Sequence, residues 1–344
     1  MFSLNKILRE NIKNLVPYSS AREEYTGEEA VFLDANENPY NSPYNRYPDP
    51  LQNKLKKRIS DIKGIPQAKI FLGNGSDEAI DLLIRAFCEP RIDNIVSIEP
   101  SYGMYEVCAD INNVKFIKVL LKNDFQLDIN AILKTININT KLIYLCSPNN
   151  PTGNCFNKQD IIEILQNFNG LVIVDEAYID FSTKESLLSI LNEYKNLVVL
   201  QTFSKAWGLA GIRLGMAFAD KEIIDVLNKI KYPYNVNSLT LEKANETLKN
   251  DRSKNAWIGQ ILEARDRLIE ELANLPFVVK VYPSDANFLL VKVNSVKNIY
   301  DYLVNKKIII RDRSNVSLCE DCLRITIGTK DENLLLMDSL KKYV

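Results

Sequence analysis

The stretch LVIVDEAY, residues 171–178, decides the fold: four consecutive apolar residues run directly into an acidic pair. An apolar run without polar alternation predicts a strand that is buried on both faces. Three more runs of this kind lie in the middle of the chain, at Ile95–Ile98, Leu142–Leu145 and Leu197–Leu200. Together they predict the centre of one large sheet.

Amphipathic stretches such as Gln159–Phe168 and Leu187–Tyr194 lie between these runs and are predicted to be helices. Buried strands joined by crossover helices form a mainly parallel sheet with helices on its faces. Ligands of such sheets bind at the carboxyl ends of the strands. Polar segments begin there after three of the runs, at residues 147–153, 175–178 and 202–205. A ligand site is therefore expected at this edge.

The last third of the chain has a different pattern, with a long helix expected at Ala256–Leu275. Short strands and two helices are expected after it, the strands at 278–282, 288–291, 308–311 and 322–326 and the helices at 298–305 and 331–343. This pattern predicts a small α+β domain at residues 241–344, beside a large domain at 31–240.

Composition narrows the class of protein. The chain has 344 residues, with 43 Lys and Arg against 44 Asp and Glu, and this balance does not favour nucleic-acid or membrane-surface binding. No stretch approaches the ~20 apolar residues of a membrane span. Residues 1–10 lack the apolar core of a secretory signal, so a cytoplasmic enzyme is expected.

Histidine is absent, which excludes Ser-His and Cys-His catalysis and histidine-ligated metals. Proton transfer then relies on other side chains or on a cofactor. The single C-x-x-C, Cys319 and Cys322, has no second pair that would suggest zinc, so reduced thiols are expected and no metal site.

Lys205 is the strongest candidate for chemistry. It lies in the polar loop 202–208 after an apolar run, a suitable place to hold an amine for bonding to an aldehyde. Arg213, eight residues on, suits a phosphate because a guanidinium binds its oxygens bidentately. The segment 73–78, GNGSDE, precedes a helical period and would offer free backbone N–H groups to an anion. These motifs describe a pocket for an aldehyde cofactor with a phosphate tail.

In order and spacing, the motifs resemble those of the fold-type I aminotransferases that use pyridoxal 5'-phosphate, and the pattern is closest to the histidinol-phosphate aminotransferases. The resemblance extends from residues 36–39, NENP, to 323–328, LRITIG. It implies a large domain with a mainly parallel sheet, a smaller α+β domain, an N-terminal arm at residues 1–30 that covers the active site, and a homodimer with shared active sites.

The resemblance also implies roles for residues around the cofactor ring. Lys205 would bond to the aldehyde and move a proton, and Asp175 would pair with the pyridine nitrogen. Tyr178 and Asn150 would bind the ring hydroxyl, and Tyr102 would stack on the ring. From the sequence alone, Asp175 could also cap a helix, and both roles could hold.

Further residues are implied on the cofactor phosphate, namely Gly75, Ser76, Asp77, Thr202, Ser204, Arg213 and, from the partner subunit, Tyr47. Asp77 is expected to contribute its amide while its carboxylate caps the helix or faces away. On the substrate side, Arg311 and Arg324 would hold the phosphate of the amino donor and then a carboxylate. Arg313 is expected on the same strand face as Arg311 but farther from the pocket, and thus a less suitable ligand. Tyr18 and Tyr234 would line the substrate pocket together with Asn150.

The implied reaction is transamination of L-histidinol phosphate with 2-oxoglutarate, which yields imidazole acetol phosphate and glutamate in histidine biosynthesis. An aromatic amino acid aminotransferase is the first alternative. A threonine-phosphate decarboxylase or a C–S lyase is the second, although the decarboxylase is expected to differ around residues 311–315. A cofactor-sensing regulator would need a DNA-binding domain, for which 344 residues leave no room.

Overall fold

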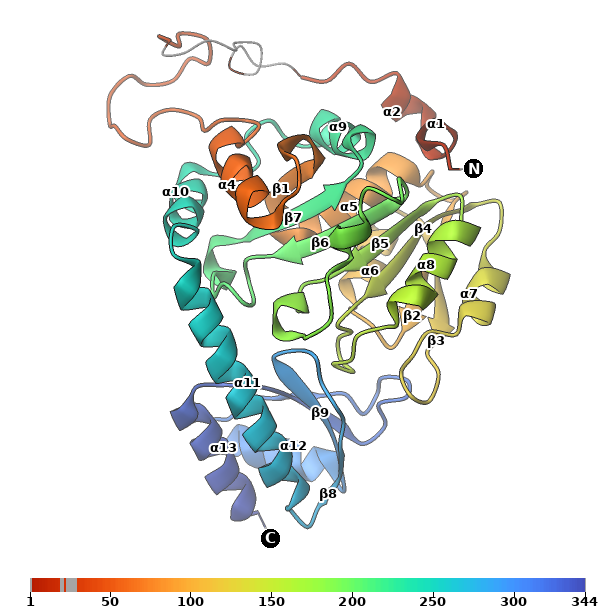
Figure 1. Ribbon diagram of the computed structural model, residues 1–344, viewed down its shortest axis with the longest axis vertical. Helices are drawn as coiled ribbons and strands as arrows, with labels where there is room; N and C mark the ends of the chain where they lie inside the picture. The colour runs from red at the N-terminus through yellow and green to blue at the C-terminus, as the bar shows by residue number, and fades with distance from the viewer. Residues whose placement is uncertain (1, 19–21, 23–29, 344) are drawn as a thin grey trace.

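The computed structural model describes residues 2–18, 22 and 30–343. Its larger part is built on a seven-stranded sheet, and its smaller part is reached through the long helix α11 (Asp251–Ala273) (Figure 1). The strands of the large sheet, in spatial order, are β1 (Ile70–Asn74), β7 (Leu214–Ala219), β6 (Leu197–Thr202), β5 (Leu171–Asp175), β4 (Thr140–Cys146), β2 (Asn94–Glu99) and β3 (Lys115–Leu120). β7 runs antiparallel to β1 and β6 on either side of it, and the other six strands all run in the same direction.

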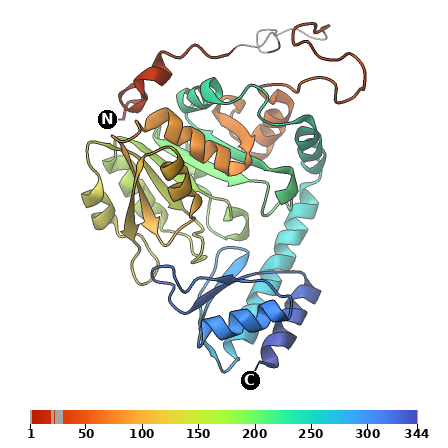
Figure 2. The same ribbon diagram turned by 180° about the vertical axis from the view of Figure 1, so that it is seen from behind.

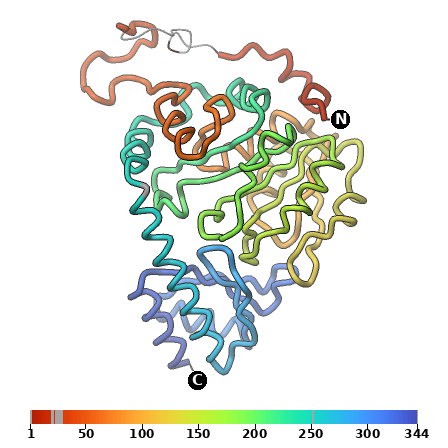
Figure 3. Tube along the Cα trace, viewed as in Figure 1, coloured from red at the N-terminus to blue at the C-terminus, as the bar shows by residue number. Residues whose placement is uncertain are grey.

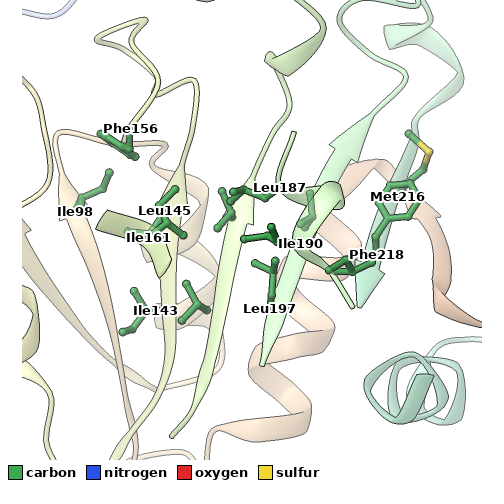
Figure 4. Packing of buried hydrophobic residues seen from close by; sticks show 14 of the residues in the cluster. Ile98, Ile143, Leu145, Phe156, Ile161, Leu187, Ile190, Leu197, Met216 and Phe218 are labelled. Carbon is green, nitrogen blue, oxygen red and sulfur yellow. The ribbon is translucent and has the colours of Figure 1, made fainter. Parts of the chain in front are cut away.

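The central strands are apolar at every position because helices cover both faces of the sheet. Along β4, Leu142 belongs to the core on one face and Ile143 to the core on the other, and both are fully buried. Each such side chain contributes about 1.5–3 kcal/mol by leaving water. Figure 4 shows Leu145 of β4 close to Ile161, which comes from a covering helix.

The two helical layers differ in which segments supply them. One face packs against α4 (Asn53–Lys63), α7 (Ile129–Thr135), α8 (Lys158–Asn167) and part of α10 (Ser238–Thr247). The other packs against α5 (Gly75–Phe87), α6 (Met104–Ile111) and α9 (Lys221–Ile230), seen from behind in Figure 2. Single 3-10 turns lie at η1 (Gln67–Lys69), η2 (Ile179–Phe181), η3 (Leu187–Ile190) and η4 (Ala210–Ile212).

The first helices, α1 (Leu4–Ile7) and α2 (Glu10–Lys13), lie against the large part. Arg9 pairs with Glu89 at 3.0 Å, and Lys229 Nζ donates to the Ile12 carbonyl at 2.7 Å. Farther along, residues 30–48 follow an extended path away from the sheet (Figure 3). Of the expected arm, residues 1, 19–21 and 23–29 lie outside the described residues.

The smaller part contains a four-stranded antiparallel sheet, ordered β10 (Arg311–Asp312), β11 (Cys322–Thr326), β9 (Phe288–Val293) and β8 (Val278–Val281). Helices α11, α12 (Val296–Asn305) and α13 (Lys330–Lys341) bury one face of it. Thr329 and Glu332 form a reciprocal capping box that starts α13.

Two expected elements are shorter than the sequence pattern predicts. A helix over 187–194 is wrong beyond η3, because the chain turns at once to enter β6 at Leu197. A strand over 308–311 is wrong for residues 308–310, since pairing with β11 begins only at Arg311 and Ile309 is 71% exposed. Within the described residues, no helix is both long and apolar enough to cross a membrane.

Candidate active site

The carboxyl ends of β1, β4, β5 and β6 meet at one edge of the sheet because these strands are parallel to one another. The segments that follow them enclose a cavity of about 140 Å³. All residues expected on the cofactor except Tyr47 line it: Gly75, Ser76, Asp77, Tyr102, Asn150, Asp175, Tyr178, Thr202, Ser204, Lys205 and Arg213. A larger cavity between α11 and α13 contains none of them.

Asp175 ends β5 and is 3% exposed. Its carboxylate accepts hydrogen bonds from the Tyr105 hydroxyl at 2.8 Å and from the Ala177 amide at 3.0 Å. Burial raises the pKa of the Asp175 carboxyl to about 6, and these two hydrogen bonds oppose the rise. The site therefore presents an acidic group whose charge is costly until a cation meets it.

Lys205 lies in the loop after β6, with Nζ 5.5 Å from the centre of the Tyr178 ring. The residue is still exposed in the single chain. Partial burial of the ammonium lowers the pKa of Lys205, the positive charge of Arg324 lowers it further, and Asp175 opposes both. A lysine with a lowered pKa loses its proton more readily, as a nucleophilic amine must.

Two glycines allow the start of α5 to approach β7 and Arg213. A Cβ on Gly215 would lie 2.1 Å from the Ser76 amide nitrogen, and one on Gly75 would lie 2.7 Å from Arg213 Nη2. Gly75 also has a φ of +70°. The guanidinium, the first turn of a helix and the hydroxyls of Thr202 and Ser204 therefore border one small space, which suits an anionic group.

Asp77 differs from expectation, because its carboxylate neither caps α5 nor faces away. It accepts a hydrogen bond from the Tyr102 hydroxyl at 3.2 Å and pairs with Arg213 Nη2 at 3.4 Å. The acid thus faces into the cavity, where it holds the arginine and the aromatic ring that are both expected on the cofactor. The expectation ignored that Arg213 supplies the positive charge that attracts this carboxylate.

Arg324 joins the smaller part of the molecule to this site. Its Nη1 donates to the side-chain oxygen of Asn150, a residue of the cavity wall, and its guanidinium lies 5.4 Å from the Phe288 ring centre. Arg311 is directly opposite Arg324 in the β10–β11 pair but is exposed. Arg313 is more buried than Arg311, which is the reverse of the expected order.

Three expected tyrosines lie outside this cavity in the single chain. Tyr47 stacks on Tyr234, with ring centres 4.4 Å apart, and the pair lines a different pocket. Tyr18 is 72% exposed, because residues up to Lys13 pack against α5 and α9 and the chain then leads away.

Tyr105 is a site residue that sequence reasoning missed. It is fully buried on α6, stacks on Tyr144 at 4.9 Å between ring centres and meets the Tyr102 ring edge-on at 5.5 Å. One residue therefore contacts both Asp175 and Tyr102. Its position three residues after Tyr102 is a weak signal, because Tyr102 precedes α6, which begins at Met104, and helical spacing alone does not bring the two rings together.

Comparisons with known proteins agree with this fold. The model of the family "Aminotransferase class I and II" matches residues 23–340, and the chain belongs to this family. It is 58% identical over 341 residues to a histidinol-phosphate aminotransferase of Parabacteroides distasonis, which covers 99% of both chains.

Solved structures extend the likeness. That of the histidinol-phosphate aminotransferase from Clostridium acetobutylicum has a TM-score of 0.80 and 28% identity, and covers 87% of this chain and 90% of that one. That of the Sinorhizobium meliloti enzyme, in complex with pyridoxal-5'-phosphate, has a TM-score of 0.79 and 22% identity over 87% and 84% of the chains, and shows the shared fold.

Pyridoxal 5'-phosphate is the cofactor of this family, and the residues present fit it. Lys205 supplies an amine for an aldehyde, and the buried carboxylate of Asp175 suits a protonated ring nitrogen. Gly75 has no side chain, and the space that a Cβ would fill beside Arg213 is left free for an anion.

Proposed function

We propose that this chain catalyses transamination between L-histidinol phosphate and 2-oxoglutarate, the reaction that forms imidazole acetol phosphate and glutamate in histidine biosynthesis. The observation that carries the proposal is the position of Arg324, which contacts a wall residue of the lysine pocket and belongs to a surface with two further arginines. Relatives at 51–58% identity bear the name of this activity.

The residues of the cavity divide the work. When bound, pyridoxal phosphate supplies the aldehyde that takes up the amino group and the ring that accepts an electron pair. Asp175 would hold the proton of the ring nitrogen, and Tyr102 would cover one face of the ring. Ser204 and Arg213, with the amides of Ser76 and Asp77, would bind the phosphate. Lys205 Nζ would carry the proton to and from the substrate carbon.

Both substrates are anions, and one set of cations suits both. L-Histidinol phosphate carries a phosphate where 2-oxoglutarate carries a carboxylate, and in a two-stage reaction each occupies the site in turn. Arg324 is half-buried and keeps a contact with Asn150, so it is held in place before either substrate arrives. We assign the anionic group of each substrate to Arg324, with Arg311 nearby.

The active form is proposed to be a cytoplasmic homodimer whose sites are shared. Apolar residues of the extended segment are freely exposed in the single chain, among them Val31 at 86%, Leu33 at 85% and Tyr40 at 78%. Such a surface favours burial against a second copy. Tyr47 from one subunit would then reach the cofactor phosphate of the other. Residues 31–240 and 241–344 are proposed as the two domains, with 1–30 as the covering arm.

The test is to compare amino donors on the cofactor-loaded protein, with 2-oxoglutarate as acceptor. L-Histidinol phosphate is expected to be used with a kcat/KM at least about a hundredfold above that of L-phenylalanine, because two charge-assisted contacts to its phosphate are lost with the latter. Lys205→Ala serves as the inactive control. An equal or better rate with L-phenylalanine would assign the chain to the aromatic amino acid aminotransferases instead.

A further inference from the structure

Three arginines share one face of the β10–β11 pair. Arg311 is directly opposite Arg324, and the pairing continues as the Arg313 amide donates to the Cys322 carbonyl at 2.9 Å. Side chains alternate along strands, so Arg311, Arg313 and Arg324 point the same way. Leu323, on the opposite face, is buried in the core of the smaller part, whereas Cys322 packs with the core of the large sheet. The arginine face is therefore directed toward the large part.

Within the described part of the chain, these three cations have no acidic partner. Among the residues that the structure describes, none of the three forms an ion pair within 4.0 Å. The nearest acid in sequence, Asp312, accepts instead from the amide and hydroxyl of Ser314. Like charges opposite one another destabilise a strand pair, so an arrangement of this kind favours binding of a multiply charged anion.

The same face leads to the catalytic lysine through continuous contacts. The Arg324 guanidinium lies against the Phe288 ring, Phe288 meets Tyr178 edge-on at 5.1 Å, and Tyr178 lies under Lys205 Nζ. An anion held by the arginines would therefore belong to a molecule whose other end reaches Lys205.

Arg313 is better placed than Arg311 to complete this anion site with Arg324. Arg311 is exposed, whereas Arg313 is half-buried and its Nε is buried with no hydrogen-bond acceptor. After burial, the charge of Arg313 is the strongest influence that lowers the pKa of Arg324, ahead of that of Arg311. A buried donor without an acceptor is costly, and an anion oxygen would satisfy it.

We infer that Arg313 is a specificity-determining residue that binds the phosphate group of the amino donor together with Arg324. The inference rests on the proposed function and extends it to a residue beyond the expected pair. Arg313 recognises the doubly charged phosphate, which needs more positive charge than the carboxylate that takes its place in the second half of the reaction.

The experiment compares L-histidinol phosphate with L-histidinol, which lacks the phosphate, on cofactor-loaded wild type and on Arg313→Gln. We expect the KM for L-histidinol phosphate to rise about tenfold or more with kcat nearly unchanged, because a charge-assisted hydrogen bond is lost. The kcat/KM for L-histidinol should stay at the wild-type value. Arg313→Lys, which keeps the charge but not the planar fork, should fall between the two.

Arg267→Gln is the matched control, since it removes an exposed arginine of α11 remote from the cavity. An equal loss with both donors overturns the inference, and so does the absence of a rise in KM for both Arg313 variants. In either case, the proposed function still stands if the wild type turns over L-histidinol phosphate. Failure of wild type to use L-histidinol phosphate overturns both. Equal visible spectra and melting temperatures establish that the variants are folded and loaded.

Discussion

A carboxylate as buried as Asp175 depends on its donors. The Tyr105 hydroxyl and the Ala177 amide provide two hydrogen bonds, yet burial still raises the pKa of Asp175 to about 6. The Asp77 carboxylate raises it further and the Lys205 ammonium opposes the rise. The buried acid therefore costs stability in the protein without cofactor, and this cost is present above pH 6 and is relieved as the pH falls toward 4.

Tyr105→Phe should increase that cost in a pH-dependent way. At pH 8 the ionised carboxylate loses a charge-assisted hydrogen bond, so the free energy of unfolding of the cofactor-free protein should fall by about 2 kcal/mol. At pH 5, where the acid is largely protonated, the loss should be smaller. Urea unfolding at the two pH values measures the difference.

Tyr144→Phe is the matched control, because Tyr144 stacks on Tyr105 and its hydroxyl donates to the neutral Ile80 carbonyl at 3.0 Å. Its effect should be about 1 kcal/mol at both pH values. If Tyr105→Phe were also independent of pH, the hydroxyl would not stabilise the charged form of Asp175.

At the scale of elements, the cavity depends on how closely β7 lies to the start of α5. Gly215 pairs with Gly73 on β1 and with Thr202 on β6, so it sits between two strands that carry site residues. The absence of a side chain there lets the first turn of α5 lie directly on the sheet. The contact between Gly215 and the first turn of α5 therefore sets both the position of β7 and the shape of the expected phosphate site.

Gly215→Ala should therefore destabilise the fold and weaken cofactor binding together. The added Cβ would meet backbone atoms of Gly75 and Ser76 that cannot move without displacing α5, at a cost of about 1–3 kcal/mol or more. Thermal unfolding and cofactor titration provide the two measurements.

Gly259→Ala is the control for this substitution, since apart from the backbone of α11 itself no described atom lies within 4 Å of the new Cβ. It should stabilise the protein by about 0.5–1 kcal/mol, because alanine favours a helix over glycine. A neutral result for Gly215→Ala would mean that α5 is free to shift away from β7.

At the scale of the whole molecule, the single chain brings the cofactor residues together but leaves Tyr47, Tyr234 and Tyr18 outside their cavity. Tyr47 lies on an extended segment with exposed apolar side chains. A second copy of the chain that covers this segment would explain why its apolar side chains are exposed and why Tyr47 lies outside the cavity of its own chain. Such a dimer predicts a specific behaviour of mixed dimers.

Tyr47→Ala and Lys205→Ala subunits, each nearly inactive alone, should recover activity when they are co-expressed. A mixed dimer would have one site with an intact Lys205 from one subunit and an intact Tyr47 from the other. Random pairing should then restore about a quarter of the wild-type sites. Co-expression of Lys205→Ala with a second Lys205→Ala copy is the control, and absence of recovery would show that each site is built from one chain.

The sequence by itself determined the centre of the fold, because apolar runs without alternation specify strands buried on both faces. It also predicted three segments of the candidate site, since residues 147–153, 175–178 and 202–205 follow β4, β5 and β6, and parallel strands end at a common edge. β1, β3 and β7 were not predicted. β3 is partly exposed, and β7 contains glycine and alanine, so their patterns are weak.

Only the tertiary structure decided which polar side chains meet. The sequence could not show that Tyr105 reaches Asp175, that Asp77 turns toward Arg213, or that Arg313 is more buried than Arg311. Each contact joins side chains from different elements, and its geometry depends on how closely those elements pack. Local periodicity reports the face of one element, whereas hydrogen bonds and charges in a buried site depend on several faces at once.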